Sequence, residues 1–390
     1  MLIAQSLPQK LSITCLSSHY SSWIEIDKNA LVQNIYQYYQ LTKPSLFAIV
    51  VKSNAYGHGL HQIAIIAEHI EYVDYLCTVS LSEAVLLRHN GIKKPILVLS
   101  IIDADLVEIL NYALEVVIYS LETAIELNKI GKKLQKKIIV HIKIDTGLSR
   151  LGIVVYEALH FIKIAASLSF IVIKGIFTHL SEAESDKPEF TVKQLMLFDT
   201  LLNDLKRLGI IIPLIHSSCS AALTSFSQSH YSMVRAGIGI YGLWPSLENK
   251  MRTQAFYPSF VLKPVLTWKT KIIQIKEVSS GTYVGYDRTY QTTKHTRIAT
   301  LPVGYWDGYD RQLSNCGSVV INNTLAPIIG RIAMNLCMVD ITGIDTHLDD
   351  EVLLLGNYQG ITAHDLANLC NTISYETVTR INPLLPRIIV

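Results

Sequence analysis

Reactive side chains follow several apolar segments of this sequence directly. Lys52 comes after the β-branched run Leu46–Val51, and His179 ends the run Phe170–His179. A lysine at the end of a buried strand is partly desolvated, so its pKa falls below about 10.4. The neutral amine that results is a nucleophile toward carbonyl carbons. Lys52 is therefore a candidate for Schiff-base chemistry.

Two further segments have the composition of a phosphate site. Ser220 follows the apolar run Ile211–His216, and Gly237 and Gly239 lie at the end of the run Met233–Ile238. Serine hydroxyls and backbone amides of glycine turns bind phosphate. A lysine and a phosphate cradle together predict pyridoxal phosphate held as a Schiff base, although an aldolase would use the same pair. Each residue alone has an ordinary structural explanation, and only their joint placement predicts a site.

Eight apolar runs alternate with helix-period segments between about residues 46 and 240. The runs are Leu46–Val51, Asp74–Val79, Pro95–Ser100, Glu115–Ser120, Lys137–Asp145, Phe170–His179, Ile211–His216 and Met233–Ile238. Continuously apolar strands that alternate with helices predict a parallel sheet covered on both faces. Eight such units predict an α/β fold of the closed (β/α)8, TIM-type barrel, with an open doubly wound sheet as the alternative. In such a barrel, residues at the strand ends share one rim.

The barrel domain is expected over residues 21–243, with Ser21–Leu41 as an opening helical element. Residues 244–260 lack clean periodicity, contain two prolines and are interpreted as a linker. Residues 261–390 show short apolar runs separated by turn residues, and only His364–Leu369 has a clear helical pattern. A mostly β C-terminal domain is therefore expected.

Composition excludes several classes of function. The 390 residues exceed what one core usually supports, and 34 basic against 32 acidic residues leave no patch for nucleic acid. No apolar run reaches the roughly 18 residues of a membrane span, and the N-terminus lacks a signal-peptide pattern. The six cysteines form no CxxC pair, so neither a metal site nor disulfides are expected. A cytoplasmic protein without membrane contact fits these features.

The segment VKSNAYGHG, residues 51–59, resembles the cofactor-lysine motif of bacterial alanine racemases. These are two-domain members of the fold-type III pyridoxal-phosphate enzymes. The likeness runs in order from Trp23 to Arg387. It implies a pyridoxal 5'-phosphate cofactor bound to Lys52 and the interconversion of L-alanine and D-alanine, a step that usually supplies D-alanine for peptidoglycan.

The resemblance also assigns roles to residues of the barrel. It implies that Arg235 contacts the pyridine nitrogen and that His179 lies against the ring face. The residues expected to bind the phosphate are Tyr56, Ser220 and the backbone of Gly237 and Ile238. In the segment HIKIDTGLSRLG, residues 141–152, Arg150 is expected to bind the substrate carboxylate. Lys143 lies where the family often has a carbamylated lysine.

The C-terminal domain matches the family too. The segment GTYVGYDRTY, residues 281–290, implies that Tyr286 is the catalytic tyrosine. In the implied two-base mechanism, Lys52 serves the D face of the substrate and Tyr286 the L face. Tyr305 and Met334 are expected to line the substrate site, and Tyr375 to contact the cofactor. In the family a partner subunit supplies the tyrosine and the methionine, so a homodimer is expected.

Two departures from the family pattern bear on specificity. Ala333 and Asn335 flank Met334 where Cys and Asp are usual, and Cys219 replaces an Asn beside Ser220. A racemase of serine or of a broader range of amino acids therefore stays open. A fold-type III decarboxylase would be expected to have Glu in place of Arg235. A single-barrel pyridoxal-phosphate carrier would lack the domain from residue 261 onward.

Overall fold

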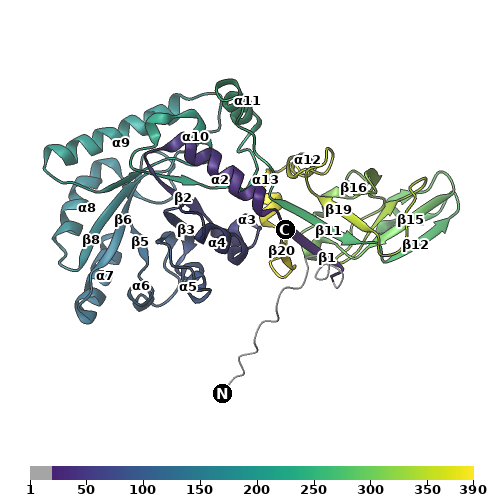
Figure 1. Ribbon diagram of the computed structural model, residues 1–390, viewed down its shortest axis with the longest axis horizontal. Helices are drawn as coiled ribbons and strands as arrows, with labels where there is room; N and C mark the ends of the chain where they lie inside the picture. The colour runs from purple at the N-terminus through teal and green to yellow at the C-terminus, as the bar shows by residue number, and fades with distance from the viewer. Residues whose placement is uncertain (1–19) are drawn as a thin grey trace, which may run out of the picture. The chain divides into compact units, whose positions relative to one another are not determined.

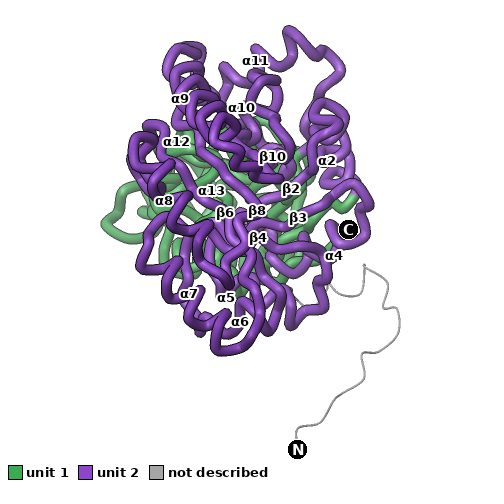
Figure 2. The backbone as a smooth tube through the Cα atoms, turned by 90° about the vertical axis from the view of Figure 1, so that its left-hand side faces the viewer, with its two compact units in different colours: residues 1–28, 264–390 green, residues 29–263 purple. Residues whose placement is uncertain are grey.

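The computed structural model describes residues 20–390, which form two compact units. One unit is Asn29–Lys263, and the other joins Pro264–Val390 to residues 20–28 (Figure 2). The prediction that the N-terminus has no signal peptide concerns residues that lie mostly outside the described range. Cys15 also lies outside that range.

The first unit contains a near-closed barrel of eight parallel strands (Figure 1). They are β2 (Leu46–Val50), β3 (Tyr75–Ser80), β4 (Ile96–Ile101), β5 (Glu115–Ile118), β6 (Ile138–Asp145), β8 (Ile171–Phe177), β9 (Leu214–His216) and β10 (Met233–Ala236). Pairing runs in the order β10-β2-β3-β4-β5-β6-β8-β9. At the remaining seam, the amide of Ser232 donates to the carbonyl of Ile215 at 3.1 Å. The predicted barrel is confirmed, and the open sheet is not formed.

Helices connect these strands on the outside of the barrel (Figure 1). They are α2 (Lys28–Thr42), α4 (Leu60–Glu68), α5 (Leu81–His89), α6 (Val107–Asn111), α7 (Leu121–Leu134), α8 (Val155–Ser167), α9 (Glu189–Arg207) and α10 (Ser220–Ser225). The segment labelled α3 (Lys52–Tyr56) is a turn of left-handed residues and not a regular α-helix. A short strand, β7 (Ile153–Val154), pairs with β6, and the 3-10 turns η2 (Ser227–Ser229) and η3 (Ile238–Tyr241) flank β10. Ser80 and Ser120 begin α5 and α7 by accepting amides of the first turn, as N-cap residues do.

The second unit is built from antiparallel and mixed sheets. Its main sheet has the order β17-β16-β19-β11-β1-β20. Its strands are β1 (Ser22–Ile26), β11 (Leu266–Lys271), β16 (Ser318–Ile321), β17 (Thr324–Pro327), β19 (Glu351–Leu355) and β20 (Arg387–Ile389). A second sheet joins β12 (Gln274–Val278), β15 (Thr296–Leu301) and β18 (Cys337–Asp340), and β13 (Tyr283–Val284) pairs with β14 (Tyr290–Gln291). The shorter elements are η4 (Tyr286–Arg288), η5 (Tyr305–Asp307), η6 (Arg311–Leu313), α12 (Ala363–Leu369) and α13 (Ser374–Thr379).

Two segments differ from the sequence-based expectation. Residues 22–26 are not helical but form β1, which pairs with β11 and β20 of the second unit. Residues 247–256 of the expected linker form helix α11 (Leu247–Phe256), which lies in the first unit. Polar bonds anchor this helix: Asn249 donates to the carbonyl of Ala221, and Arg252 to that of Ala183. Because polar side chains and not an apolar face hold this helix in place, its sequence lacks the apolar periodicity from which a helix is predicted.

Among residues 20–390, no helix combines the length and apolarity needed to cross a bilayer. Within the same range, no group of three or more His, Cys, Asp or Glu side chains is arranged to hold a metal ion. The five described cysteines are free thiols.

Candidate active site

The lysine motif folds into a left-handed turn after β2. Lys52 begins the turn, and Ser53–Tyr56 have φ values of 55°, 55°, 51° and 54°. Residues other than glycine adopt this backbone conformation at a cost of roughly 1–2 kcal/mol each. The carboxylate of Glu83 supports the turn by accepting the amides of Ser53 at 2.7 Å and Val79 at 3.0 Å. The turn fixes the backbone from which the Lys52 amine projects.

Several cations lie at this end of the barrel, and their mutual repulsion changes their protonation. Burial lowers the pKa of Lys52, and the nearby Arg150 lowers it further, while Glu83 opposes both. Lys143, on β6, is 5% exposed. Its burial, with repulsion from Arg150, Arg235 and Lys52, lowers its pKa to about 8. Both amines are thus easier to deprotonate than ordinary surface lysines.

His179 follows strand β8 and is kept neutral. Burial lowers its pKa well below the usual value, and positive charges, first Arg235 and then Arg150, lower it further. Its imidazole therefore presents an uncharged aromatic face at neutral pH. A flat cofactor ring can pack against such a face.

A small polar cradle lies where β9 and β10 end. The Oγ of Ser220 accepts the amide of Gly237 at 2.9 Å and that of Gly239 at 3.2 Å. Both acceptor positions of the hydroxyl are thereby used, and its proton can be donated to an anion. A Cβ atom at Gly237 would come within 2.7 Å of the Tyr56 hydroxyl oxygen, so glycine is needed there. Ile238, which begins η3, is buried beside it.

Arg235 lies inside the barrel and is 4% exposed. One of its terminal nitrogens donates to the carbonyls of Thr178 at 3.0 Å and Ser217 at 3.2 Å. The other contacts the Nδ1 of His216, and the guanidinium lies 5.0 Å from the ring centroid of Phe177. Burial lowers its pKa to about 10, at which the group still carries a full positive charge at neutral pH.

The remaining predicted residues lie in the second unit. Tyr286 is 70% exposed on η4 and follows Gly285, which has a φ of 73°. Tyr305 and Met334 come together because the amide of Tyr305 donates to the carbonyl of Ala333 at 3.1 Å. Tyr375 is half-buried in α13. The structure thus divides the predicted residues into a barrel group and a group in the second unit.

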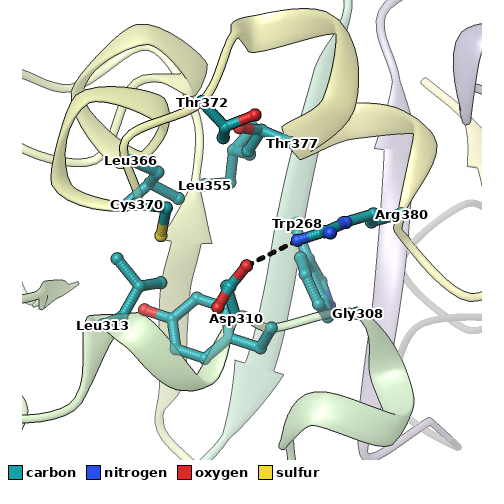
Figure 3. Close-up of a pocket in the computed structure, with 11 residues that line it drawn as sticks. Trp268, Gly308, Asp310, Leu313, Leu355, Leu366, Cys370, Thr372, Thr377 and Arg380 are labelled. Atoms are coloured by element: carbon teal, nitrogen blue, oxygen red, sulfur yellow. Dashed lines mark hydrogen bonds and ion pairs between the residues drawn. The ribbon is translucent and has the colours of Figure 1, made fainter.

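The second unit also contains a pocket that none of the predicted residues lines (Figure 3). Its walls include Trp268 and Tyr309, whose rings pack edge to face at 5.6 Å. Arg380 and Asp310 form an ion pair of 2.8 Å at its edge. The pocket is lined mainly by buried core residues of this unit, so it is explained by packing and is given no functional role.

Two residues of the barrel were missed by the sequence reasoning. Glu83 supports the lysine turn, and its position three residues after Ser80 is the spacing of a helix-capping acid. His216 contacts Arg235, and its place at the end of an apolar run was visible in the sequence. The sequence could not show which group each of them contacts, because the contacted residues are distant along the chain.

The chain matches known protein families along nearly its whole length. Residues 26–245 match the family described as alanine racemase, N-terminal domain, and residues 265–389 match alanine racemase, C-terminal domain. An alanine racemase of Halothermothrix orenii is 40% identical over 372 residues, which is 94% of this chain and 96% of the relative. One of Methanococcus maripaludis is 37% identical over 94% of this chain and 98% of the relative.

Solved structures agree with these matches. An alanine racemase of Clostridium difficile 630 superposes with a TM-score of 0.89 at 34% identity, covering 95% of this chain and 96% of that one. One from Bartonella henselae, with covalently bound pyridoxal phosphate, gives a TM-score of 0.82 at 27% identity and covers 95% and 100%.

The depressed pKa of Lys143 predicts a pH-dependent stability. The folded state releases this proton at about pH 8, whereas the unfolded chain keeps it to about 10.5. The unfolded state therefore binds more protons between these values, so this group adds stability as pH rises from 8 toward 10.5. We expect the free energy of unfolding of Lys143→Met to lack this rise. Urea unfolding of both proteins at several pH values measures the difference, with Lys132→Met, at an exposed position, as the control. Parallel curves for parent and Lys143→Met would contradict the assignment.

Proposed function

Since this chain belongs to the alanine racemase family, we propose that it interconverts L-alanine and D-alanine with pyridoxal 5'-phosphate bound at Lys52. The observation that supports the cofactor best is the pairing of a half-buried lysine amine with a hydroxyl-and-amide cradle in one barrel. The Bartonella relative, which has covalently bound pyridoxal phosphate, supports the same proposal.

The residues present fit the cofactor chemically. The lowered pKa of Lys52 suits an amine that must attack an aldehyde. The Ser220 hydroxyl and the backbone of Gly237 and Ile238 suit a phosphate, with the Tyr56 hydroxyl beside them. The Gly237 amide donates to Ser220 in this structure, so it would have to turn from that hydroxyl toward the anion. When bound, pyridoxal phosphate withdraws electrons from the substrate and so acidifies the proton at Cα.

Racemisation removes the Cα proton from one face and returns a proton to the other. A single base would have to cross the plane of the substrate, so two bases on opposite faces are required. We assign the D face to the Nζ of Lys52 and the L face to the phenol of Tyr286 from a second copy of the chain. The exposure of Tyr286 on a short turn suits a residue offered to another subunit. Met334 and Tyr305 would then line the substrate site, and Tyr375 would contact the cofactor.

Arg150 and Lys143 would orient the substrate. Arg150 is exposed in the loop after β6 and can bind the substrate carboxylate through paired N–H donors. With a pKa of about 8, roughly a tenth of Lys143 is neutral at pH 7 and able to react with carbon dioxide. A carbamate at Lys143 would replace a repelled cation by an anion that attracts Arg150.

Arg235 favours racemisation over related reactions of the same cofactor. It has only donors, so it cannot accept a proton from the pyridine nitrogen. With pyridoxal phosphate bound, Arg235 would therefore leave the pyridine nitrogen unprotonated, and this would disfavour transamination. A decarboxylase would be expected to have an acid in this position.

The wider setting follows the family. We propose that the D-alanine supplies peptidoglycan synthesis and that the protein works in the cytoplasm, where its free thiols stay reduced. Ala333 and Asn335 alter the surroundings of Met334, which keeps serine as a second candidate substrate. Assay of a panel of L- and D-amino acids decides between alanine alone and a broader range.

Lys52→Ala is expected to lose the visible absorption band of the lysine-bound cofactor. Its racemase activity should fall on the order of 10²–10⁴-fold or more, because both the attachment point and one base are removed. Absorption spectra after addition of pyridoxal phosphate measure the first effect. Lys132→Ala, at an exposed position, is the matched control. A band of parental intensity in Lys52→Ala would exclude this lysine as the cofactor site.

Tyr286→Phe separates the two bases. We expect exchange of the Cα proton with deuterium, starting from L-alanine, to slow on the order of 10²–10⁴-fold. NMR of the substrate in D2O measures it from each enantiomer. Tyr283→Phe, at an exposed tyrosine three residues earlier, is the control. If Tyr286→Phe exchanges L-alanine at the parental rate, the two-base assignment is wrong.

Arg235→Glu is expected to increase transamination relative to racemisation, because a carboxylate can keep the pyridine nitrogen protonated. The ratio of pyruvate formed to alanine racemised measures the partition, so a general loss of activity does not affect the result. An unchanged ratio would count against the proposed role of Arg235.

A further inference from the structure

A line of buried polar side chains crosses the barrel from Arg235 to Glu115. Arg235 contacts the Nδ1 of His216, and the Nε2 of His216 lies 2.9 Å from the Nδ1 of His141. The Nε2 of His141 lies 2.9 Å from a carboxylate oxygen of Glu115. All four residues are at most 6% exposed, and they come from β10, β9, β6 and β5.

The line passes strand β8 because Gly175 leaves room for it. A Cβ atom at this position would lie 2.1 Å from the Nδ1 of His141, which no side chain could tolerate. The pairing of β6 with β8 skips Lys174, which forms a bulge beside this glycine. Bulges redirect side chains, and here the Nζ of Lys174 reaches Glu115 at 2.5 Å.

The donors and acceptors allow only one arrangement of protons. Arginine can only donate, so the Nδ1 of His216 must accept. The proton of His216 is then on Nε2 and is donated to the Nδ1 of His141. The proton of His141 is in turn on Nε2 and is donated to Glu115. Both imidazoles are therefore neutral, each with its proton on Nε2.

The electrostatics agree with this arrangement. Burial lowers the pKa of His216 and of His141, which keeps both rings neutral. Hydrogen bonds from His141 and Lys174 outweigh the effect of burial at Glu115 and lower its pKa, so it stays a carboxylate. The other groups that face it are the hydroxyl of Tyr75 on β3, at 3.2 Å, and the thiol of Cys77 on the same strand.

We propose that Glu115 is a positioning residue that acts on Arg235 through His141 and His216, by fixing the proton of each imidazole on Nε2. This deepens the proposed function and rests on the role given there to Arg235. If the protons moved to the Nδ1 atoms, an N–H of His216 would face an N–H of Arg235. The guanidinium would then be displaced from the position at which it meets the cofactor ring.

Glu115→Gln tests the relay because an amide has one accepting and one donating end. Lys174 can only donate, so it takes the carbonyl oxygen of the introduced amide and leaves the NH2 group facing His141. The Nε2 of His141 then faces a donor, while Arg235 still faces the Nδ1 of His216 as a donor. We expect both imidazole protons to move to Nδ1 and Arg235 to give way, because its guanidinium keeps the carbonyls of Thr178 and Ser217 as acceptors. Lys174→Met alone keeps the carboxylate and should leave the protons on Nε2. In the double variant the amide can turn its oxygen toward His141, which should restore the parental arrangement.

Nitrogen-15 NMR of the histidine rings, recorded on full-length protein without added cofactor, reports which nitrogen carries the proton. We expect Nε2–H for His141 and His216 in the parent, in Lys174→Met and in the double variant, and Nδ1–H in Glu115→Gln. Finding Nδ1–H on His216 in the parent overturns the proposal, even if Glu115→Gln does not fold. Unchanged tautomers in folded Glu115→Gln overturn it as well.

The cofactor-loaded protein gives a second readout. The ratio of transamination to racemisation should rise in Glu115→Gln and return toward the parental value in the double variant. Shifted tautomers with an unchanged ratio would refute the action of Glu115 on Arg235. A parent that binds no pyridoxal phosphate would instead refute the proposed function and leave the tautomer result standing.

Discussion

The barrel interior keeps several positive charges out of water, and the rest of the site is arranged around that cost. Removing an ion from water costs several kcal/mol even after the protein relaxes. Lys52 and Lys143 reduce the cost by releasing their protons more easily. Arg235 stays charged at neutral pH although burial lowers its pKa to about 10, and it donates to the carbonyls of Thr178 and Ser217. An amine ready to react and a guanidinium held in place follow from the same constraint.

The left-handed turn after β2 holds the backbone of Lys52 among these charges. The left-handed turn at Ser53–Tyr56 is unfavourable by itself, and Glu83 ties it to β3 by accepting the amide of Ser53 in the turn and the amide of Val79 on the strand. The same carboxylate partly offsets the positive surroundings of Lys52. One acidic residue thus stabilises the turn and moderates the protonation of the lysine. Glu83 therefore offsets part of the unfavourable free energy of the turn and also opposes the lowering of the Lys52 pKa.

Small residues at two positions admit the larger functional groups. Gly237 allows the hydroxyl of Tyr56 to approach the backbone of the cradle, and Gly175 admits His141 to the barrel centre. The bulge at Lys174 then supplies a cation for Glu115, which would otherwise be a buried carboxylate held by His141 and Tyr75 alone. Close packing makes such positions specific, because a single added methyl group has nowhere to go.

The sequence by itself determined the eight strands and the rim at which they end. Continuous apolar runs and helical periods are local patterns, and parallel strands must place their carboxyl ends together. Lys52, Ser220, Arg235 and Gly237 could therefore be assigned to one end of one barrel. The roles of Tyr286 and Met334 came from family resemblance and remain predictions, since their assignment to a shared site depends on a second chain.

The tertiary structure alone decided the contacts between residues distant in sequence. Residues 22–26 became a strand because β11 and β20 offer it hydrogen bonds, and α11 formed because polar side chains anchor it. The line from Arg235 to Glu115 depends on four strands meeting in the barrel and on a bulge that turns Lys174 inward. No local pattern encodes such a line, because the partner of each buried polar group is chosen by strand register and not by its neighbours in the chain.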